Sequence, residues 1–251
     1  MNSKPLIKLA CIILALSISA CAATQVKEGS EPAQRTIEDV LPEGEKVALD
    51  VHDPWEGYNR WMYNFNAKFD RYVFLPVVGA YQVLPSFART GVSNIFRNLG
   101  EFRNITNALL QGKPVQSGSS LGRLGVNTTI GILGLFDPAT KFGLYHQKED
   151  FGQTLGVWGV GPGPFLVLPI LGPSTLRDAP SFIPDAAIHP IYKPYPWLVE
   201  LNNDELLVMS GIDAIDARSN LGFRYYEMGS PFEYIWVRNL WLEYRQLQIE
   251  K

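Results

Sequence analysis

Residues 149–178 read EDFGQTLGVWGVGPGPFLVLPILGPSTLRD, which is the most irregular apolar sequence in this chain of 251 residues. No charged residue occurs from Phe151 to Leu176, yet glycine and proline recur so often that neither a long helix nor a central strand can run through the segment. Irregular backbone at apolar depth needs partners for its polar groups, and it is tolerated where protein buries it or where it lines a cavity. We therefore expect this segment to line an opening, as irregular backbone or as a short hairpin around residues 165–171.

The N-terminal sequence has the order of a secretion signal. Two lysines, Lys4 and Lys8, precede an apolar run, and the run ends in Ile-Ser-Ala directly before Cys21. This arrangement resembles a bacterial lipobox, in which lipid is attached to the cysteine and cleavage makes that cysteine the first mature residue. After removal of the signal peptide (residues 1–20), an unmodified Cys21 would be a lone thiol in an oxidising compartment. We therefore expect a covalent lipid on Cys21.

Composition restricts the remaining possibilities. Residues 21–52 are polar and acidic without an apolar period, which predicts a lipidated flexible tether, and residues 53–251 are long enough for a sizeable helical body. The formal net charge is −3 with no block of like charges, so a nucleic-acid partner has no electrostatic support. No metal cluster, nucleotide site or Cys/His pair stands out in the sequence. We expect no cofactor beyond the lipid on Cys21.

The body begins with a strong helix signal. Asp53-Pro54-Trp55-Glu56 predicts a capping box, with the Asp53 side chain at the N-cap. Aromatic residues then recur at spacings of three and four up to Tyr72, and the opposite face is rich in asparagine. Such a helix either packs its aromatic face into a core or lies in a membrane interface, where tryptophan and tyrosine are enriched. The sequence leaves both interpretations open.

Apolar periodicity predicts helices for most of the remaining body, so the expected fold class is all-α. Residues 86–111 predict two amphipathic helices that meet near Gly100. The glycines of residues 115–135, several of them four apart, would let helices approach closely. The helices expected after the first one span residues 77–84, the two halves of 86–111, and residues 115–135, 203–228 and 230–249.

One short motif suggests an enzyme. Gly118-Ser119-Ser120-Leu121-Gly122 matches the G-x-S-x-G nucleophile elbow of lipases and esterases. The elbow requires an apolar strand that leads into a strained turn, whereas the preceding residues 111–116 read QGKPVQ. A serine lipase that uses Ser120 is therefore the weakest functional hypothesis, and we expect a protein that is not an enzyme.

Several separated blocks of sequence resemble one known family. They are DPxEGYNRxMYNFN at residues 53–66, Asn98-Leu99, Asn107, Leu110-Gln111-Gly112, Arg123 with Asn127-Thr128, FGxTLG at 151–156, GVG at 159–161, and the run from Pro169 to Asp178. On these blocks the chain resembles the MlaA/VacJ family of outer-membrane phospholipid-transport lipoproteins. The resemblance extends over essentially the whole mature body.

The resemblance implies a ring-like bundle of amphipathic helices in the inner leaflet of the outer membrane, anchored by lipid at the periplasmic face, with a central amphipathic channel. It implies that phospholipid mislocalised to the outer leaflet is removed beside trimeric porins and passed to a periplasmic carrier, which maintains lipid asymmetry. A phospholipid needs a polar route for its head group and an apolar wall for its tails, because moving the head group through hydrocarbon is costly.

Within this interpretation we assign candidate site residues. Arg177 and Asp178 close the uncharged stretch and are expected to form a structural charge pair rather than to bind head groups, since a charge in apolar surroundings needs a partner. For the first-helix residues of the candidate channel or gate, simple packing is the alternative. The six candidate channel or gate residues are Asn64, Phe65, Gly161, Phe165, Leu168 and Pro169.

Two rivals to the phospholipid channel remain at this stage. A structural lipoprotein associated with porins would bind them without moving lipid, and a serine lipase would depend on Ser120. The sequence alone does not separate a scaffold from a conduit.

Overall fold

The computed structural model describes residues 53–181, 183–185, 202–227 and 229–251. The expected signal peptide (1–20), the lipidated Cys21 and the tether (21–52) lie outside the described residues. The elements are α2 (Glu56–Phe69), the π-helical segment η2 (Asp70–Phe74), α3 (Leu75–Tyr81), α4 (Ser86–Leu110), α5 (Pro114–Thr129), α6 (Pro138–Lys141), α7 (Phe151–Val157), β1 (Phe165–Leu168), β2 (Gly172–Thr175), the 3₁₀ turn η3 (Ala179–Ser181), α9 (Asn203–Asn220) and α10 (Glu233–Glu250).

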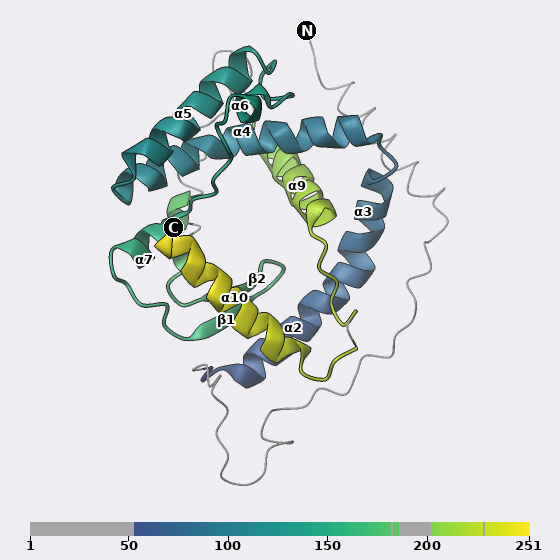
Figure 1. Cartoon of the computed structure of the whole chain (residues 1–251). Helices are drawn as coiled ribbons and strands as arrows, with labels where there is room; N and C mark the ends of the chain where they lie inside the picture. The colour runs from purple at the N-terminus through teal and green to yellow at the C-terminus, as the bar shows by residue number, and fades with distance from the viewer. Residues whose placement is uncertain (1–52, 182, 186–201, 228) are drawn as a thin grey trace.

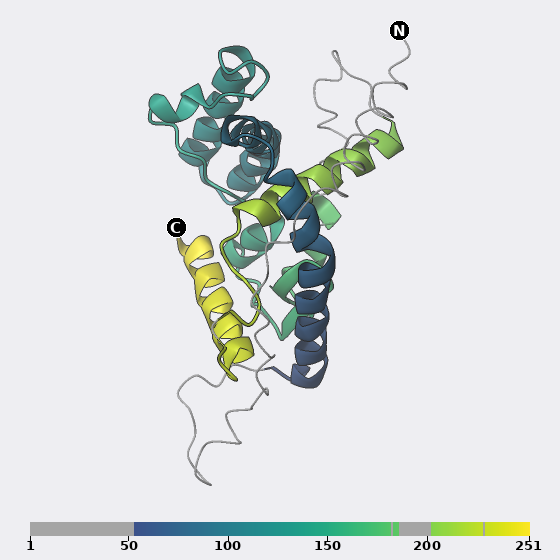
Figure 2. The same cartoon turned by 90° about the vertical axis from the view of Figure 1, so that its right-hand side faces the viewer.

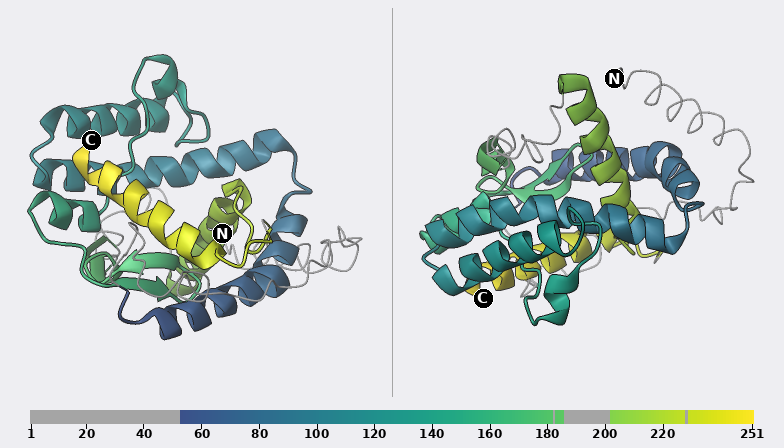
Figure 3. Two further views of the ribbon diagram at one scale, coloured as in Figure 1. Left: turned by 60° about the horizontal axis from the view of Figure 1, so that its bottom comes forward. Right: turned by 90° about the horizontal axis from the view of Figure 1, so that it is seen from above.

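The helices are arranged as a ring. In Figure 1, α2, α3 and α4 follow one another around the centre of the view, and α10 and α7 close the opposite side. The edge-on view of Figure 2 places the β-hairpin between α2 and α10. Seen from above in Figure 3, α4 and α5 lie side by side while α9 extends away from them. The expected all-α class with one short hairpin is confirmed. Among the described helices, none is both long and apolar enough to cross a membrane.

The first helix continues past the proline that was expected to end it. Pro76 cannot donate a backbone hydrogen bond, and its ring would clash with the carbonyl of the residue four positions earlier in a regular α-helix. Here five residues, Asp70–Phe74, adopt π-helical geometry, and the amide of Leu75 donates to the carbonyl of Asp70. The wider turn accommodates the proline, so α2, η2 and α3 form one continuous rod. The prediction of a separate helix that begins at residue 77 is therefore wrong, because α3 begins at Leu75 and continues the first helix.

The predicted capping box at Asp53 is also wrong. Helix α2 begins at Glu56, and its N-cap residue Trp55 makes no side-chain capping bond. The Asp53 carboxylate instead accepts hydrogen bonds from Asn59 Nδ2 at 2.7 Å, from Arg238 at 3.1 Å and from the hydroxyl of Tyr234. Asp53 thus joins the start of α2 to α10, a long-range role that outcompetes the local cap.

Helix α4 runs without interruption through Gly100, so the two helices expected to meet there are one. Its neighbour α5 packs against it through buried polar groups. Arg123 Nε donates to Glu101 at 2.6 Å, and another guanidinium nitrogen lies 3.0 Å from Asp137. Both Arg123 and Glu101 are essentially inaccessible to solvent. A buried charge needs such a partner, and this network holds α4, α5 and the loop before α6 together.

Three other expected helix boundaries were misplaced. Helix α5 ends at Thr129 because Ile132, Leu133 and Gly134 adopt left-handed backbone angles, which interrupt a right-handed helix. Helix α9 ends at Asn220, eight residues earlier than expected, where extended backbone at Leu221 leaves the helix. Helix α10 begins at Glu233.

Of the two forms expected, irregular backbone or a short hairpin around residues 165–171, the structure has the hairpin, and it extends to Thr175. Strand β1 pairs with β2 in antiparallel register, with Phe165 opposite Thr175. In the part of the chain that the structure describes, no strand lies along the other edge of β1, and two asparagines of α2 satisfy this edge. Asn59 donates to the carbonyl of Phe165 at 3.0 Å and accepts from the amide of Val167 at 2.8 Å. Asn66 does the same for the turn, donating to the carbonyl of Leu168 at 2.8 Å and accepting from the amide of Ile170 at 2.7 Å.

The two asparagines reach the strand together because their spacing along the helix nearly equals the spacing of their partners along the hairpin. Asn59 and Asn66 are seven residues apart, about 10.5 Å along an α-helix at 1.5 Å per residue. Their bonded positions on the hairpin shift by three residues, about 10 Å at 3.3 Å per strand residue. Helix α2 therefore lies along β1 with both amides in register. Two residues of the asparagine-rich face seen in the sequence, Asn59 and Asn66, thus dock the hairpin.

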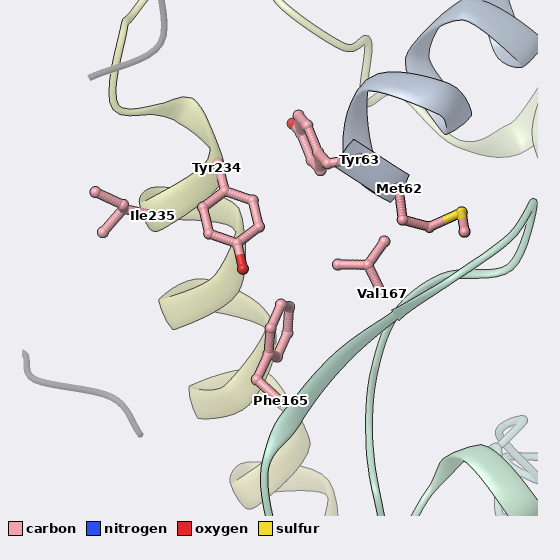
Figure 4. Packing of buried hydrophobic residues seen from close by; sticks show 6 residues of the cluster. All are labelled: Met62, Tyr63, Phe165, Val167, Tyr234 and Ile235. Carbon is pink, nitrogen blue, oxygen red and sulfur yellow. The ribbon is translucent and has the colours of Figure 1, made fainter. Parts of the chain in front are cut away.

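The apolar core is small and lies where the hairpin meets two helices. Figure 4 shows Phe165 and Val167 of β1 between side chains of α2 and α10. The phenyl ring of Phe165 packs edge-on against the rings of Tyr234 and Trp241. The buried members of this cluster are Met62, Tyr63, Phe165, Val167, Tyr234 and Ile235.

Elsewhere the usual distribution of side chains is reversed. Among the described residues, 27 polar or charged side chains are buried against 10 apolar ones, while 35 large apolar side chains are exposed. The aromatic face of α2 belongs to the exposed group, with Trp61 62% exposed and Tyr58 44% exposed. The alternative that this face packs into the core is therefore wrong for these residues, and its place in a membrane interface stays a prediction. Apolar surface of this extent marks a protein that contacts an apolar environment or other proteins.

Replacing Asn59 by alanine should leave a buried carbonyl and a buried amide of β1 without partners. We expect the free energy of unfolding in detergent to fall by about 1–3 kcal/mol, as measured by denaturant titration. Asn94→Ala, which removes a solvent-accessible amide bonded to the carbonyl of Leu135, is the matched control and should change it by less than about 0.5 kcal/mol. Equal stability of the two variants would contradict the role of Asn59.

Candidate functional site

A cavity of about 500 Å³ lies beside the tip of the hairpin. Its walls come from α2 and η2 on one side, from α10 on the other, and from the hairpin turn and the segment after α9. The volume falls within the range of small-molecule sites in proteins. The lining residues are Tyr63, Asn66, Phe69, Asp70, Phe74, Ile170, Leu171, Gly172, Pro173, Arg218, Leu221, Phe223, Tyr225, Val237, Leu240, Trp241 and Tyr244.

The cavity wall is dominated by aromatic and aliphatic side chains. Several rings are locked by edge-to-face packing, for example Tyr225 with Tyr63 and Phe223 at 5.0 Å between ring centroids. Burial is the main cause that raises the pKa of Tyr225 to about 12, so this phenol stays neutral at physiological pH. Such a wall offers contacts for hydrocarbon and few groups that could act on a substrate chemically.

One ion pair interrupts the apolar wall. Arg218 donates to both carboxylate oxygens of Asp70, with Nε at 2.5 Å and a second nitrogen at 2.7 Å. Asp70 is the first residue of the π-helical segment, and Arg218 lies near the end of α9. Both side chains are buried. The bidentate pair fixes the end of α9 against the rod formed by α2, η2 and α3.

The hairpin tip contributes two apolar side chains at the edge of the cavity. Ile170 has a φ of 66°, a left-handed conformation that is rare for a β-branched residue. Asn66 holds this conformation by accepting from the Ile170 amide, and Leu171 follows with 66% of its surface exposed. Backbone strain that is held by specific partners is a feature of functional sites.

The structure separates the six candidate channel or gate residues. Phe165 is 2% exposed and belongs to the apolar core, while Gly161 has open space around it. Phe65 is exposed and stacks between Trp61 and Phe69, and Asn64 accepts a hydrogen bond from the hydroxyl of Tyr226.

Leu168 and Pro169 lead into the hairpin tip, and none of the six candidates is among the lining residues of the cavity. Residues close to them in the sequence do line the cavity, namely Asn66, Phe69, Ile170 and Leu171. A role of the six residues in a passage stays a prediction.

Sequence reasoning missed Asp70 and Arg218 because no local signal joins them. They are 148 residues apart in the sequence, and neither residue differs from an ordinary polar residue of an amphipathic helix. The cavity-lining residues of α10 were also missed. Their repeat, with Val237, Leu240, Trp241 and Tyr244 at spacings of three and four, was the signal that could have found them.

The predicted charge pair at the end of the Gly/Pro-rich segment is present. Arg177 Nε lies 2.9 Å from Asp178, and both side chains are buried. The pair is part of a larger clamp, because Arg245 of α10 also contacts Asp178 at 3.1 Å and donates to the carboxylate of Asp150. A Cβ at Gly152 would lie 2.4 Å from both Arg245 and Asp178, so the clamp requires glycine there. This clamp fixes α10 to the start of α7.

The clamp changes the acidity of its carboxylates. Burial alone would raise the pKa of Asp150, but the hydrogen bonds and positive charge of Arg245 outweigh it and lower the pKa to about 2. The pKa of Asp178 is lowered as well, again because the hydrogen bonds and charges of Arg177 and Arg245 outweigh burial. Both carboxylates therefore stay ionised in the folded protein well into the acid range.

Ser120 does not lie in a nucleophile elbow. It is buried within α5, five residues or more from either helix end, and the segment before the helix is a turn after α4 rather than a strand. The structural context that G-x-S-x-G needs is absent at this position. In the part of the chain that the structure describes, no group of three His, Cys, Asp or Glu side chains could hold a metal ion.

The sequence profile described as "MlaA lipoprotein" matches residues 51–248. The chain belongs to the MlaA family. The match covers the described body up to residue 248, including the hairpin, the cavity walls and the clamp.

Named members of the MlaA family are similar to a large part of the chain. The "Intermembrane phospholipid transport system lipoprotein MlaA" of Escherichia coli (strain K12) is 39% identical over 150 residues, which are 58% of this chain and 59% of that protein. The protein of the same name from Haemophilus influenzae (strain ATCC 51907 / DSM 11121 / KW20 / Rd) is 32% identical over 179 residues, 69% of each chain. An uncharacterised protein of Rickettsia prowazekii (strain Madrid E) is 38% identical over 149 residues, and the match spans 59% of its length, less than two thirds.

A solved structure is also similar. Its description reads "Structural basis for maintenance of bacterial outer membrane lipid asymmetry", and it superposes with a TM-score of 0.63 at 31% sequence identity. The match covers 79% of this chain and 100% of that one. The MlaA-family ring of helices is therefore shared between the two proteins.

The clamp of Arg245 with Asp150 and Asp178 predicts a loss of stability in acid. Because the folded-state pKa of Asp150 is about 2, below its ordinary value of about 3.9, this carboxylate stabilises the fold above pH 4 and loses its contribution as pH falls toward 2. We expect the melting temperature in detergent to fall steeply between about pH 4 and pH 2. The double variant Asp150→Asn, Asp178→Asn should be less stable at neutral pH with a shallower acid dependence; parallel curves would refute this assignment.

Proposed function

We propose that the protein is a non-enzymatic lipoprotein of the outer membrane that conducts phospholipid. In this proposal it removes mislocalised phospholipid from the outer leaflet and passes it to a periplasmic carrier, which maintains lipid asymmetry. Membership of the MlaA family supports the proposal, as do the names of the relatives in Escherichia coli and Haemophilus influenzae. The single observation that carries it is the apolar cavity between α2, the hairpin tip and α10.

The chemistry of the cavity suits acyl chains. Hydrocarbon removed from water gains about 0.8 kcal/mol per methylene, and the aromatic wall supplies the surface that receives it. The hairpin tip adds Ile170 and Leu171 at the cavity edge, and α10 adds Leu240 and Tyr244, all four exposed. These side chains form an apolar path into the cavity, along which a lipid tail would enter.

The exterior supports residence in a membrane leaflet. Aromatic side chains of α2 such as Trp61 are exposed on one face, a placement that favours the boundary between hydrocarbon and water. The covalent lipid expected on Cys21 would anchor the chain at the periplasmic face. Trimeric porins are proposed as neighbours in the membrane, and a periplasmic lipid-binding protein as the acceptor of phospholipid.

The absence of a nucleophile elbow at Ser120 favours a conduit over a lipase. No serine or histidine is among the described residues that line the cavity, and Ser120 lies in α5, which contributes none of them. The remaining alternative is a lipoprotein that only holds porins in place, and two experiments separate it from a conduit.

A photo-crosslinking residue at Leu171 or Tyr244 should label phospholipid after purification. Both positions line the cavity, so bound lipid would persist there when detergent replaces the surrounding membrane. The matched control is the same residue at Trp61, which faces outward and contacts only lipid that detergent dilutes. We expect labelling at Leu171 and Tyr244 to exceed that at Trp61 by about tenfold, the ratio for a binding preference of about 1.4 kcal/mol. Equal labelling at all three positions would argue against a lipid-binding cavity.

A second test is done in cells. Deletion of the gene should raise phospholipid in the outer leaflet, as measured by leaflet-selective chemical labelling, and filling the cavity with Val237→Trp should raise it to a similar level. Leu247→Trp, an exposed position of α10 that does not line the cavity, should behave as wild type. A porin scaffold predicts normal leaflet composition in Val237→Trp cells, so that result would replace the conduit by the scaffold.

A further inference from the structure

Asp70 and Arg218 are the only charged residues among the described residues that line the cavity. Their charges cancel, and their geometry is that of a bidentate pair, with distances of 2.5 and 2.7 Å between nitrogen and oxygen. Each is less than a tenth exposed. Among the described lining residues, this pair is therefore the one charged feature of a wall that is otherwise mostly aromatic and aliphatic.

The guanidinium of Arg218 is nearly saturated. It carries five N–H groups, and four of them are used: two by Asp70, one by the carbonyl of Leu221 at 3.0 Å and one by the carbonyl of Phe223 at 3.1 Å. These acceptors are all protein groups. Only one N–H group of Arg218 is left that could donate to a phosphate in the cavity.

We infer that Asp70 masks Arg218, so that the cavity takes up the acyl chains of phospholipids irrespective of the charge of their head groups. This inference rests on the proposed function and names the specificity of the same site. Asp70 acts as a positioning residue: it does not hold the lipid, and it keeps a positive charge of the wall from attracting an anionic head group.

The physical reason lies in the low polarity of the cavity. An unpaired guanidinium in such surroundings attracts an anion strongly, because the surrounding protein screens the charge poorly. Arginine also matches phosphate oxygens with two parallel hydrogen bonds. Removal of the Asp70 charge should therefore create a preference for anionic lipid that the wild-type chain lacks.

The experiment compares two lipids in one assay. The full-length lipoprotein, with a photo-crosslinking residue at Leu171, is reconstituted in vesicles of equal parts phosphatidylethanolamine and phosphatidylglycerol. In the wild-type background the crosslinked lipids should reflect the vesicle composition. In Asp70→Asn the ratio of anionic to zwitterionic lipid should rise about tenfold, the factor that one charged hydrogen bond of about 1.4 kcal/mol produces.

Asp53→Asn is the matched control. It removes a carboxylate from another buried arginine, Arg238, at a place that does not line the cavity. Its stability should fall, while the lipid ratio should stay at the wild-type value. A structural defect alone would shift both variants alike. An unchanged ratio in a folded Asp70→Asn protein overturns the inference.

Two further measurements decide the matter even when Asp70→Asn does not fold. The wild-type protein needs no variant, and a preference of its cavity for phosphatidylglycerol overturns the inference directly. The double variant Asp70→Asn, Arg218→Gln carries no charge in the wall and should label both lipids equally; an anionic preference there also overturns it. Failure of the proposed function has a different outcome: when detergent replaces the vesicle lipid before irradiation, no lipid of either class is then labelled above the Trp61 control.

Discussion

The rest of the structure depends on how the free edge of strand β1 is satisfied. A two-stranded hairpin is marginal on its own, and a strand edge buried among helices would leave carbonyls and amides without partners. Asn59 and Asn66 supply these partners with their side chains, because the backbone groups of a helix are already bonded within the helix and cannot extend a sheet. By fixing the hairpin along α2, they also set where its tip, the π-helical segment and α10 face each other. The cavity exists because of that docking.

The sequence predicted the elements whose causes are local. Glycine and proline in residues 159–173 made a long helix impossible and a hairpin the natural alternative, and the apolar repeats located most helices. The failures have a common reason. Asp53 was expected to cap its own helix, but it binds Asn59 and α10, and Gly100 was expected to separate two helices, but packing of α4 against α5 carries the helix through it. In both places tertiary contacts override a local preference.

The candidate site was predictable only in part, and sequence distance explains the difference. Arg177 and Asp178 are adjacent, so a buried pair could be expected from the uncharged residues before them. Asp70 and Arg218 are 148 residues apart, and Arg245 reaches Asp150 across 95 residues. No periodicity joins such positions. The asparagines of α2 were noticed as an unusual polar face, yet their partner is a strand edge, which a single sequence does not reveal.

The reversed placement of polar and apolar side chains also affects how stability depends on temperature. In globular domains the heat-capacity increase on unfolding, about 12–15 cal/mol/K per residue, comes from apolar surface that becomes exposed to water. Here many large apolar side chains already lie outside, and the groups that unfolding would release are mostly amides, carboxylates and guanidinium groups. Exposure of polar surface lowers the heat capacity. The stability curve of this protein should therefore be flatter than that of a water-soluble domain of equal length, with less curvature toward the cold.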